Sequence, residues 1–382
     1  MDITLTVILV IAFALLFDFT NGFHDTANAM ATSVATGALK PRVAVVLAAV
    51  LNLAGAFLST EVAKTISSGI INTGSDGREL ITPALIFAGL IGATLWNFVT
   101  WYLGLPSSSS HALFGGLIGA ALLGSGIGAV NFGSVVSNIV IPALLAPLVA
   151  GVAALIGTVI VYRMTRQATV PHAKGAFRIA QTVSASLVAL AHGTSDAQKT
   201  MGVITLTLVA ANLQQPDTSP QFWVILGCGL AIALGTALGG WRIMRTVGTR
   251  ITDVESPQGF AAEASSAATI LAASHLGFPL STTQVVSGSV VGVGLGKRLA
   301  AVHWGVAGRI GLGWLLTLPA AAAVGALAAW IAVSSTIGLG VVAVGAVVVI
   351  GVIYWLSRRS PVTAGNVNEQ QPQRGRKQEV DA

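Results

Sequence analysis

Two stretches of polar residues interrupt long apolar runs and repeat one pattern. They are residues 21–29 and 192–200, and in both a glycine, an acid and a further polar residue occur at the same spacing. Four positions correspond in this way: Asn21 with His192, Gly22 with Gly193, Asp25 with Asp196, and Asn28 with Lys199. On a helix, positions i, i+4 and i+7 share one face, so each stretch would present an acid between two other polar side chains.

Carboxylates inside apolar sequence point to cation or proton chemistry. An acid in a membrane span costs roughly 2.5–3.5 kcal/mol on insertion scales, so it is functional by default. We therefore predict coupling-ion or proton sites at both acids, with a purely structural pair between helices as the alternative. The histidines beside them have rings that titrate near neutral pH. The predicted coupling-ion and proton group is Asp25, Asp196, His192, His24 and Asn21.

Two clusters of hydroxyl side chains follow Gly-x-Pro sequences, in residues 104–110 and 277–283, and they occur in the same order as the two polar stretches. The proline breaks a helix, and the hydroxyl run after it suits the start of a new one. Free N–H groups and the positive dipole end at such a start favour an anion. Two such starts facing each other could hold a tetrahedral oxyanion; helix caps or close packing of small residues are the alternative.

The predicted substrate-binding residues are Ser108, Ser109, Ser110, Ser281, Thr282, Thr283, Asn28 and Lys199. Lys199 brings a positive charge within reach of Asp196 at i+3, so it either contacts the substrate or only neutralises that acid. Asp18 lies near the first stretch and could cap it. A bound metal ion is neither required nor excluded by these residues.

The composition is that of an integral membrane protein. Of the 382 residues, 54% are hydrophobic and 9% are charged, whereas soluble domains have about 25% charged residues. Many apolar runs approach the ~20 residues that a spanning helix needs, and they lack the alternation of barrel strands. The single cysteine, Cys228, excludes an intramolecular disulfide. We expect a retained N-terminal segment rather than a signal peptide.

The sequence predicts an all-α polytopic protein made of two inverted-topology repeats with broken helices or re-entrant hairpins. We expect the first repeat at 1–161, a basic cytoplasmic linker at 162–178, the second repeat at 179–357 and a disordered cytoplasmic tail at 358–382. If the tail is cytoplasmic and each hydroxyl cluster lies in a hairpin, 17 of the 20 Lys and Arg residues fall on the cytoplasmic side. That is the bias of the positive-inside rule, and it places the N-terminus outside.

Inverted repeats with interrupted helices are typical of secondary transporters, whose site lies near the midplane where the repeats meet. The basic net charge of +6 then records topology and implies no nucleic-acid partner. An anion channel is the second hypothesis, since half-helix ends also select anions. A membrane enzyme with a metal centre at His24-Asp25 and His192…Asp196 is the third. No cofactor is expected, and whether the chain forms a homo-oligomer stays open.

These motifs resemble the inorganic phosphate transporter (PiT) family over nearly the whole chain. Residues 21–29 and the run Ala191-His192-Gly193…Asp196…Gln198-Lys199 are similar to the bacterial forms of the two family signatures, and the Gly-x-Pro hydroxyl segments also match. The resemblance implies low-affinity phosphate symport in the plasma (inner) membrane, usually with protons and often of a neutral metal-phosphate complex. Sodium coupling or sulfate transport is the alternative. Thr194-Ser195 departs from the usual Ala-Asn, which leaves the geometry of the second ion site open.

Overall fold

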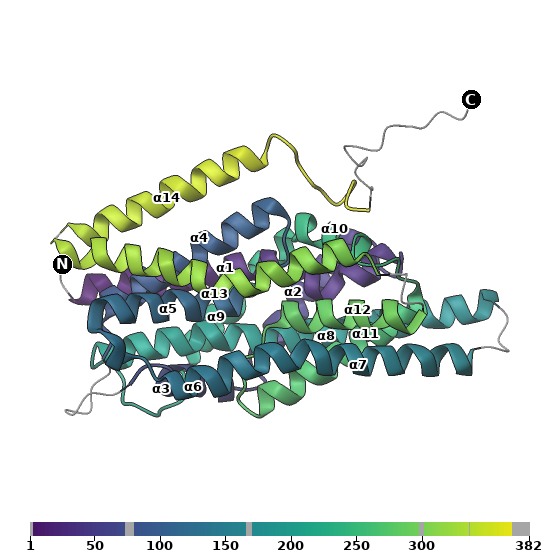
Figure 1. Cartoon of the computed structure of the whole chain (residues 1–382), viewed down its shortest axis with the longest axis horizontal. Helices are drawn as coiled ribbons and strands as arrows, with labels where there is room; N and C mark the ends of the chain where they lie inside the picture. The colour runs from purple at the N-terminus through teal and green to yellow at the C-terminus, as the bar shows by residue number, and fades with distance from the viewer. Residues whose placement is uncertain (1–2, 73–79, 166–169, 298–301, 336, 369–382) are drawn as a thin grey trace.

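The chain folds into a bundle of long helices, as a computed structural model shows for residues 3–72, 80–165, 170–297, 302–335 and 337–368 (Figure 1). Within these residues the only β pairings are two isolated bridges. The α-helices are α1 (Ile3–Ala35), α2 (Pro41–Gly55), α3 (Glu61–Gly69), α4 (Pro83–Leu103), α5 (Ser109–Ser125), α6 (Phe132–Val135), α7 (Ile141–Met164), α8 (Val170–Ala210), α9 (Phe222–Leu238), α10 (Trp241–Thr249), α11 (Ser256–His275), α12 (Thr282–Lys297), α13 (Trp304–Ser334) and α14 (Gly338–Ser357).

Five helices of the described part are long and apolar enough to cross a membrane: α1, α4, α13, α14, and α7 with the short helices before it. The bent pair α9 and α10, which turns by 70° at its break, makes a sixth span if it is counted as one. Large apolar side chains cover the outer helices, such as Leu144 and Leu148 on α7 and Leu315 on α13, all of them exposed. Apolar surface of this extent belongs against lipid. The all-α membrane fold is therefore confirmed.

Each hydroxyl cluster lies at the tip of a helical hairpin. Helices α4 and α5 run antiparallel, since Gly89 contacts Leu117 and Leu85 contacts Gly124. Helices α11 and α12 do the same, with Ser266 bonded to Ser289 near their middle. Figure 1 shows the two hairpins in opposite halves of the bundle, and their tips touch, because Ser110 Oγ donates to the Leu280 carbonyl at 3.3 Å. The predicted broken helices are thus present.

Glycine makes the two hairpin turns possible. Gly104 ends α4 with φ 65°, and Gly277 follows α11 with φ 78°, a region that other residues rarely adopt. Each turn rests on a short helix from the other half of the sequence. Gly104 contacts α10, where Thr246 Oγ1 donates to its carbonyl at 2.8 Å, and a Cβ placed on Gly277 would lie 3.1 Å from Thr65 of α3.

The two halves of the sequence interlock instead of forming two lobes. Helix α5 packs on α13 so closely that a Cβ on Gly119 would overlap the Ala322 carbonyl. Helix α12 packs on α7 in the same way, through Gly292 against Gly151. The boundaries of the predicted repeats and their inversion stay predictions, and these matched contacts support them.

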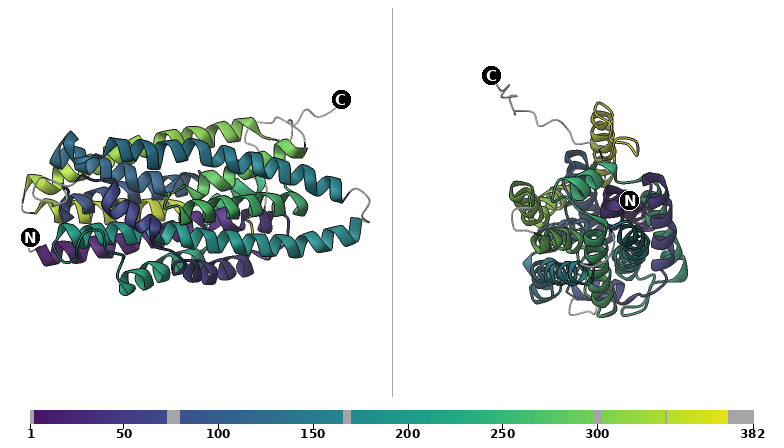
Figure 2. Two further views of the ribbon diagram at one scale, coloured as in Figure 1. Left: turned by 90° about the horizontal axis from the view of Figure 1, so that it is seen from below. Right: turned by 90° about the vertical axis from the view of Figure 1, so that its right-hand side faces the viewer.

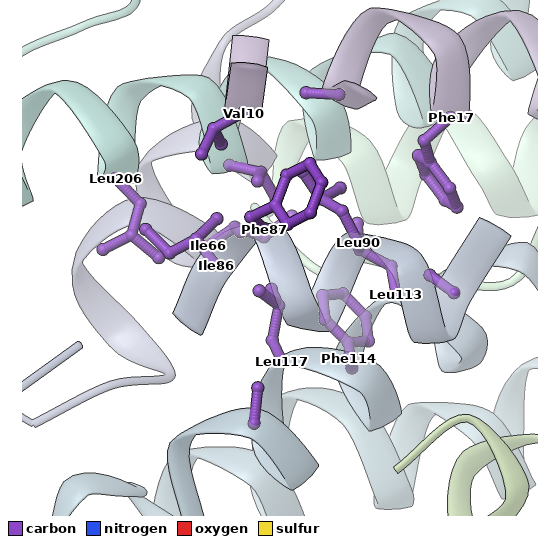
Figure 3. Close-up of a cluster of buried hydrophobic side chains, with 14 of the residues drawn as sticks. Val10, Phe17, Ile66, Ile86, Phe87, Leu90, Leu113, Phe114, Leu117 and Leu206 are labelled. Carbon is purple, nitrogen blue, oxygen red and sulfur yellow. The ribbon is translucent and has the colours of Figure 1, made fainter. Parts of the chain in front are cut away.

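The largest hydrophobic cluster surrounds the first hairpin. Phe87 of α4 lies within it and meets Phe13 of α1 edge to face, with 4.9 Å between ring centroids. Figure 3 shows side chains from α1, α3, α4, α5 and α8 converging on this region, among them Val10, Ile66 and Leu206. Helix α14 lies at the margin of the bundle, against α4 and α13 (Figure 2).

The start of the tail packs on the bundle. Arg245 of α10 donates to the Asn366 carbonyl at 2.6 Å, and Val367 is only 2% exposed. Asn368 Nδ2 donates to the carbonyl of Val34 in α1. Residues 358–368 are therefore placed, although the sequence predicts disorder from 358; residues 369–382 lie outside the described part. Of the predicted linker 162–178, α7 includes 162–164 and α8 begins at Val170.

Candidate functional site

Both polar motifs lie within uninterrupted helices that cross at the centre of the bundle. Residues 21–29 belong to α1 and residues 192–200 to α8. The two helices run antiparallel: Asn21 Nδ2 bonds Asp196 Oδ2 at 3.4 Å, and Thr36, directly after the end of α1, bonds Gln181, which lies equally far back on α8. All the predicted site residues are buried, at 3% exposed or less.

Asp25 accepts hydrogen bonds from both hairpins. Ser109 Oγ of the first hairpin donates to its Oδ2 at 2.8 Å, and Thr283 Oγ1 of the second is 3.1 Å from its Oδ1. The ring of His24 also contacts Oδ1, with Nδ1 at 2.7 Å. Thr283 in turn accepts from Asn28 Nδ2 at 2.9 Å. The first acid therefore joins α1 to both tips.

Asp196 has the corresponding place on α8. Thr282 Oγ1, which corresponds to Ser109, donates to its Oδ2 at 3.3 Å. Lys199 Nζ lies 2.5 Å from Oδ1, and His192 Nε2 lies 3.4 Å from Oδ2. The other ring nitrogen of His192 contacts Asn52 Oδ1 of α2 at 3.1 Å. A full positive charge thus lies beside the second acid, where the first has only the His24 ring.

The remaining hydroxyls of the two tips organise the helix starts. Ser108 Oγ caps α5 by accepting from His111 N, and Ser281 Oγ accepts from Gln284 N at the start of α12. Both are the N-cap interaction that serine provides at helix starts. Ser110 bonds one tip to the other through the Leu280 carbonyl. The cap interpretation thus describes Ser108 and Ser281, whereas the hydroxyls of the next helical positions point at the acids.

The centre of the site has the donor set of a cation site. Ligand atoms of Asp25, His192 and Asp196 lie within 4.8 Å of one another. Two carboxylates so close in a medium of low dielectric repel each other strongly unless a cation or protons lie between them. In the part of the chain that the structure describes, the oxygens Asn21 Oδ1 and Asn28 Oδ1 have no hydrogen-bond partner, so amide oxygens are also available to a cation.

The structure brings together the residues that the sequence singled out, and it adds four that the sequence analysis did not select. Thr100 of α4 lies 3.2 Å from His24 Nε2, and Ser107 bonds Thr100 at 2.8 Å. Asn52 bonds Thr236 of α9 at 2.8 Å and thereby connects the two halves beside His192. Ser107 belongs to the first hydroxyl cluster but was not selected as a ligand, whereas Thr100, Asn52 and Thr236 are polar positions in apolar sequence that no spacing distinguishes.

A further buried acid, Glu263 of α11, lies along α1 from Asp25. Its carboxylate accepts from Thr32 and Ser33 of α1 and from Ser184 of α8 at 2.6–2.7 Å. Gln181 Nε2 also points at it, at 3.3 Å. Because four donors surround it, this carboxylate links three helices as a fully bonded group.

Several known proteins are similar in sequence to this chain over most of its length. A sequence profile described as the phosphate transporter family matches residues 21–325. A protein of Mycobacterium tuberculosis named "Probable low-affinity inorganic phosphate transporter" is 51% identical over 369 residues, which cover 94% of this chain and 86% of that protein. A Bacillus subtilis protein of the same name is 44% identical over 334 residues, 87% of this chain and 98% of that one.

One solved structure, described as "The sodium-dependent phosphate transporter", is also similar. It superposes with a TM-score of 0.75 at 27% sequence identity. The match covers 85% of this chain and 98% of the other. The likeness therefore extends over most of the helix arrangement.

Proposed function

This chain belongs to the phosphate transporter family, and we propose that it imports inorganic phosphate by symport with a cation, in the first instance protons. It is a multi-pass membrane transporter and not an enzyme. We infer the coupling ion and the ionic form of the substrate from the charges of the site.

The observation that carries the proposal is the meeting of two helix starts with two aspartates. Helices α5 and α12 begin at Ser109 and Thr282, and the side chains of these residues donate to Asp25 and Asp196. The first N–H groups of a helix lack acceptors within the helix and carry partial positive charge. Two such ends directed at one point suit a phosphate group, which has acceptors on every side.

Coupling follows from charge. Phosphate is an anion, and Asp25 and Asp196 next to it would repel it unless cations or protons neutralise them. The group Asp25, His192 and Asp196 provides the ligand atoms for such a cation. Binding of phosphate and cation would therefore be mutually dependent, which is the physical basis of symport. A phosphate that arrives with a divalent metal would satisfy the same requirement.

Sodium coupling is the second candidate, and one observation favours it. The similar solved structure is described as sodium-dependent. Lys199 argues against sodium coupling here, since its ammonium group lies 2.5 Å from Asp196 and already supplies one positive charge. Protonation of the remaining acid or of a histidine ring would then complete the neutralisation.

The interlocked helices restrict how alternating access can occur. The sequence suggests that the two halves rock about the site. Because α5 packs on α13 and α12 packs on α7 by backbone contact, we expect the moving units to contain pairs of helices that travel together. Each hairpin would move with the long helix on which it rests.

The chain is expected in the plasma membrane with its N-terminus outside and its C-terminus in the cytoplasm. The end of α7 and the start of α13, which carry Arg163 and Arg309, lie toward the same end of the bundle in Figure 1. This arrangement supports the positive-inside orientation. A cysteine at exposed Ser360 should react with an impermeant maleimide only after permeabilisation, and one at exposed Gln215 should react in intact cells. The reverse pattern would invert the topology.

The decisive experiment is uptake into proteoliposomes. Labelled phosphate and labelled sulfate are supplied separately while pH, sodium and magnesium gradients are imposed one at a time. We expect phosphate to accumulate only with an inward proton gradient, to be lost with a protonophore, and to exceed sulfate uptake. Accumulation that follows the sodium gradient at constant pH would replace protons by sodium, and a steady current without accumulation would indicate a channel.

A further inference from the structure

The antiparallel register of α1 and α8 places a third acid opposite Lys199. The contacts Asn21–Asp196 and Thr36–Gln181 fix this register, because α1 advances by as many residues as α8 goes back between them. Asp18 lies as many residues before Asn21 on α1 as Lys199 lies after Asp196 on α8. Since both steps lead in the same direction along the bundle, Asp18 and Lys199 lie at one level.

Asp18 is completely buried, yet its carboxyl group makes no hydrogen bond of normal geometry. In the described residues neither of its oxygens has a partner that meets the length and angle of such a bond, and the same is true of the nearby Thr200 hydroxyl. The Thr200 hydroxyl is the donor beside this carboxyl group, and the charges of Asp196 and Lys199 also act on it. A buried carboxylate without a well-formed hydrogen bond is costly, so this group requires a cation or a proton during the cycle.

Neither Asp18 nor Lys199 has a charged counterpart at the corresponding position of the other half. When the two motifs are matched, Asp18 corresponds to Ala189, and Lys199 corresponds to the uncharged Asn28. One half thus contains an extra acid and the other an extra base, and the fold brings the two to one level. Two departures of opposite charge at one place are best explained as parts of one device.

We propose that Lys199 is a tethered cation with two carboxylate positions, Asp196 and Asp18, and that its transfer between them is coupled to the loading of the site. The inference rests on the proposed symport. In the present structure the ammonium group is on Asp196. When the coupling cation occupies the group Asp25, His192 and Asp196, it repels the ammonium, which moves along its flexible side chain to Asp18.

In this arrangement the Lys199 ammonium group supplies the positive charge beside Asp196 when the carrier is empty. Without a coupling cation, Lys199 neutralises Asp196, so the empty carrier returns across the membrane with this acid paired. With cation and phosphate bound, Asp18 receives the ammonium. Asp18 therefore serves the loaded carrier, and Lys199 serves the empty one.

The test compares two transport modes in proteoliposomes containing the full-length protein. Exchange of labelled for unlabelled phosphate, with equal concentrations on both sides, needs only the loaded carrier, whereas net uptake also needs the empty return. We expect Asp18→Asn to slow exchange by about tenfold or more, since the ammonium has no second position. We expect Lys199→Met to lower net uptake by a similar factor and to lower exchange less than Asp18→Asn does, because only the empty carrier needs the tethered charge. The double variant should exchange as Lys199→Met does.

Restoration of exchange in the double variant is the critical result, because a structural role for Asp18 would not produce it. If the double variant exchanges as slowly as Asp18→Asn, or if Asp18→Asn exchanges like the parent, the proposal is wrong. Asp18→Glu keeps a carboxylate and should restore exchange, and Thr205→Val, which removes another buried unpaired hydroxyl of α8, is the matched control for folding. Failure of the parent itself to exchange phosphate would instead refute the proposed function.

Discussion

At the scale of single residues, the site is defined by which hydroxyl points at which acid. Ser109 and Thr283 donate to Asp25, and Thr282 donates to Asp196. A hydroxyl that donates to a carboxylate has its oxygen free to accept from another donor or to ligate a cation. The three side chains can therefore change partners when a substrate enters, without a change of helix position.

The carboxylates are the groups whose removal should abolish coupling. Asp25→Asn and Asp196→Asn each replace a carboxylate by an amide whose NH2 group faces hydroxyl donors, and in Asp196→Asn it also faces Lys199. Each charge-assisted hydrogen bond contributes about 1.5–3 kcal/mol, so we expect concentrative phosphate uptake to fall on the order of 100-fold in both variants. Uptake by proteoliposomes measures this, and quantitation of the protein in the membrane controls for insertion. Parental accumulation in either variant would refute the assignment of that acid.

Thr283 is the hydroxyl that connects Asn28 to Asp25, so it offers a graded test. Thr283→Ser keeps the hydroxyl, so its rate of phosphate uptake should stay within about threefold of the parent. Thr283→Val keeps the shape but removes the hydroxyl, so its rate should fall about tenfold, which corresponds to the loss of one or two hydrogen bonds. The measurement is the initial rate of phosphate uptake against phosphate concentration. Equal rates for the serine and valine variants would show that the side chain acts only by packing.

The sequence predicted the site residues because polar groups in apolar helices are conspicuous and occurred twice. It did not predict their pairing. Ser108 and Ser281, expected as ligands, are N-caps in the structure, since the third residue after each supplies the N–H group. For Asp18 the sequence indicated closeness to the site and offered a cap role, although its spacing from Asn21 and Asp25 puts it on the same face of one helix.

At the scale of helices, the hairpins depend on backbone contact through glycine. A Cβ on Gly119 of α5 would overlap the Ala322 carbonyl of α13, and no rotation of a side chain can relieve a clash between two backbones. Small residues at such crossings are the usual means of helix association in membranes. The helix that holds Ser109 is thus fixed to α13 along its length.

Gly119→Ala should therefore destabilise the protein although alanine favours helices. The helices must separate, and we expect a loss of at least ~2 kcal/mol, as for overpacked cores. Gly345→Ala on α14, where nothing lies within 4 Å of the added Cβ, should be neutral or raise stability by up to about 1 kcal/mol. Thermal unfolding in detergent, followed by size-exclusion profile, measures both. A Gly119→Ala variant as stable as the parent would show that this crossing is not tight.

Helix identities and hairpin turns were predictable from apolar runs and from Gly-x-Pro, and the spacing within residues 21–29 placed their polar side chains on one helical face. Helix α1 runs through this motif from Ile3 to Ala35, but the partners of its polar side chains were not predictable. The polar side chains there are satisfied by α8 and by the hairpins, whose residues are distant in the sequence. Local pattern cannot reveal such partners.

At the scale of the whole molecule, the tail segment 358–368 packs on one end of the bundle, where it contacts α10 and α1. Arg242 donates to the carbonyls of Ser357 and Ser360, Arg245 donates to Asn366, and Val367 is buried. The composition of the tail gave no sign of this, because its contacts come from α10 and α1. Whether α1 can move at this end depends on these contacts.

Truncation tests this contribution. Removal of residues 361–382 should lower the free energy of unfolding by about 1.5–3 kcal/mol, the value of one buried valine side chain, with a lower melting temperature. Removal of residues 370–382 alone is the matched control and should lower the melting temperature less than the longer truncation, because it keeps residues 361–368. Equal stability of the two truncated proteins would show that the segment only rests on the surface.

The interlocking of the halves has a consequence for biogenesis. The chain is made from its N-terminus, so α5 is synthesised long before α13, whose backbone it is shaped to meet. Until then its glycine face can be covered only by lipid or by the insertion machinery, and the nascent first half has no complete fold of its own. Ribosome-bound intermediates that end before α13 should accordingly be protease-sensitive at the first hairpin, and the two halves should assemble only when both are present in the same membrane.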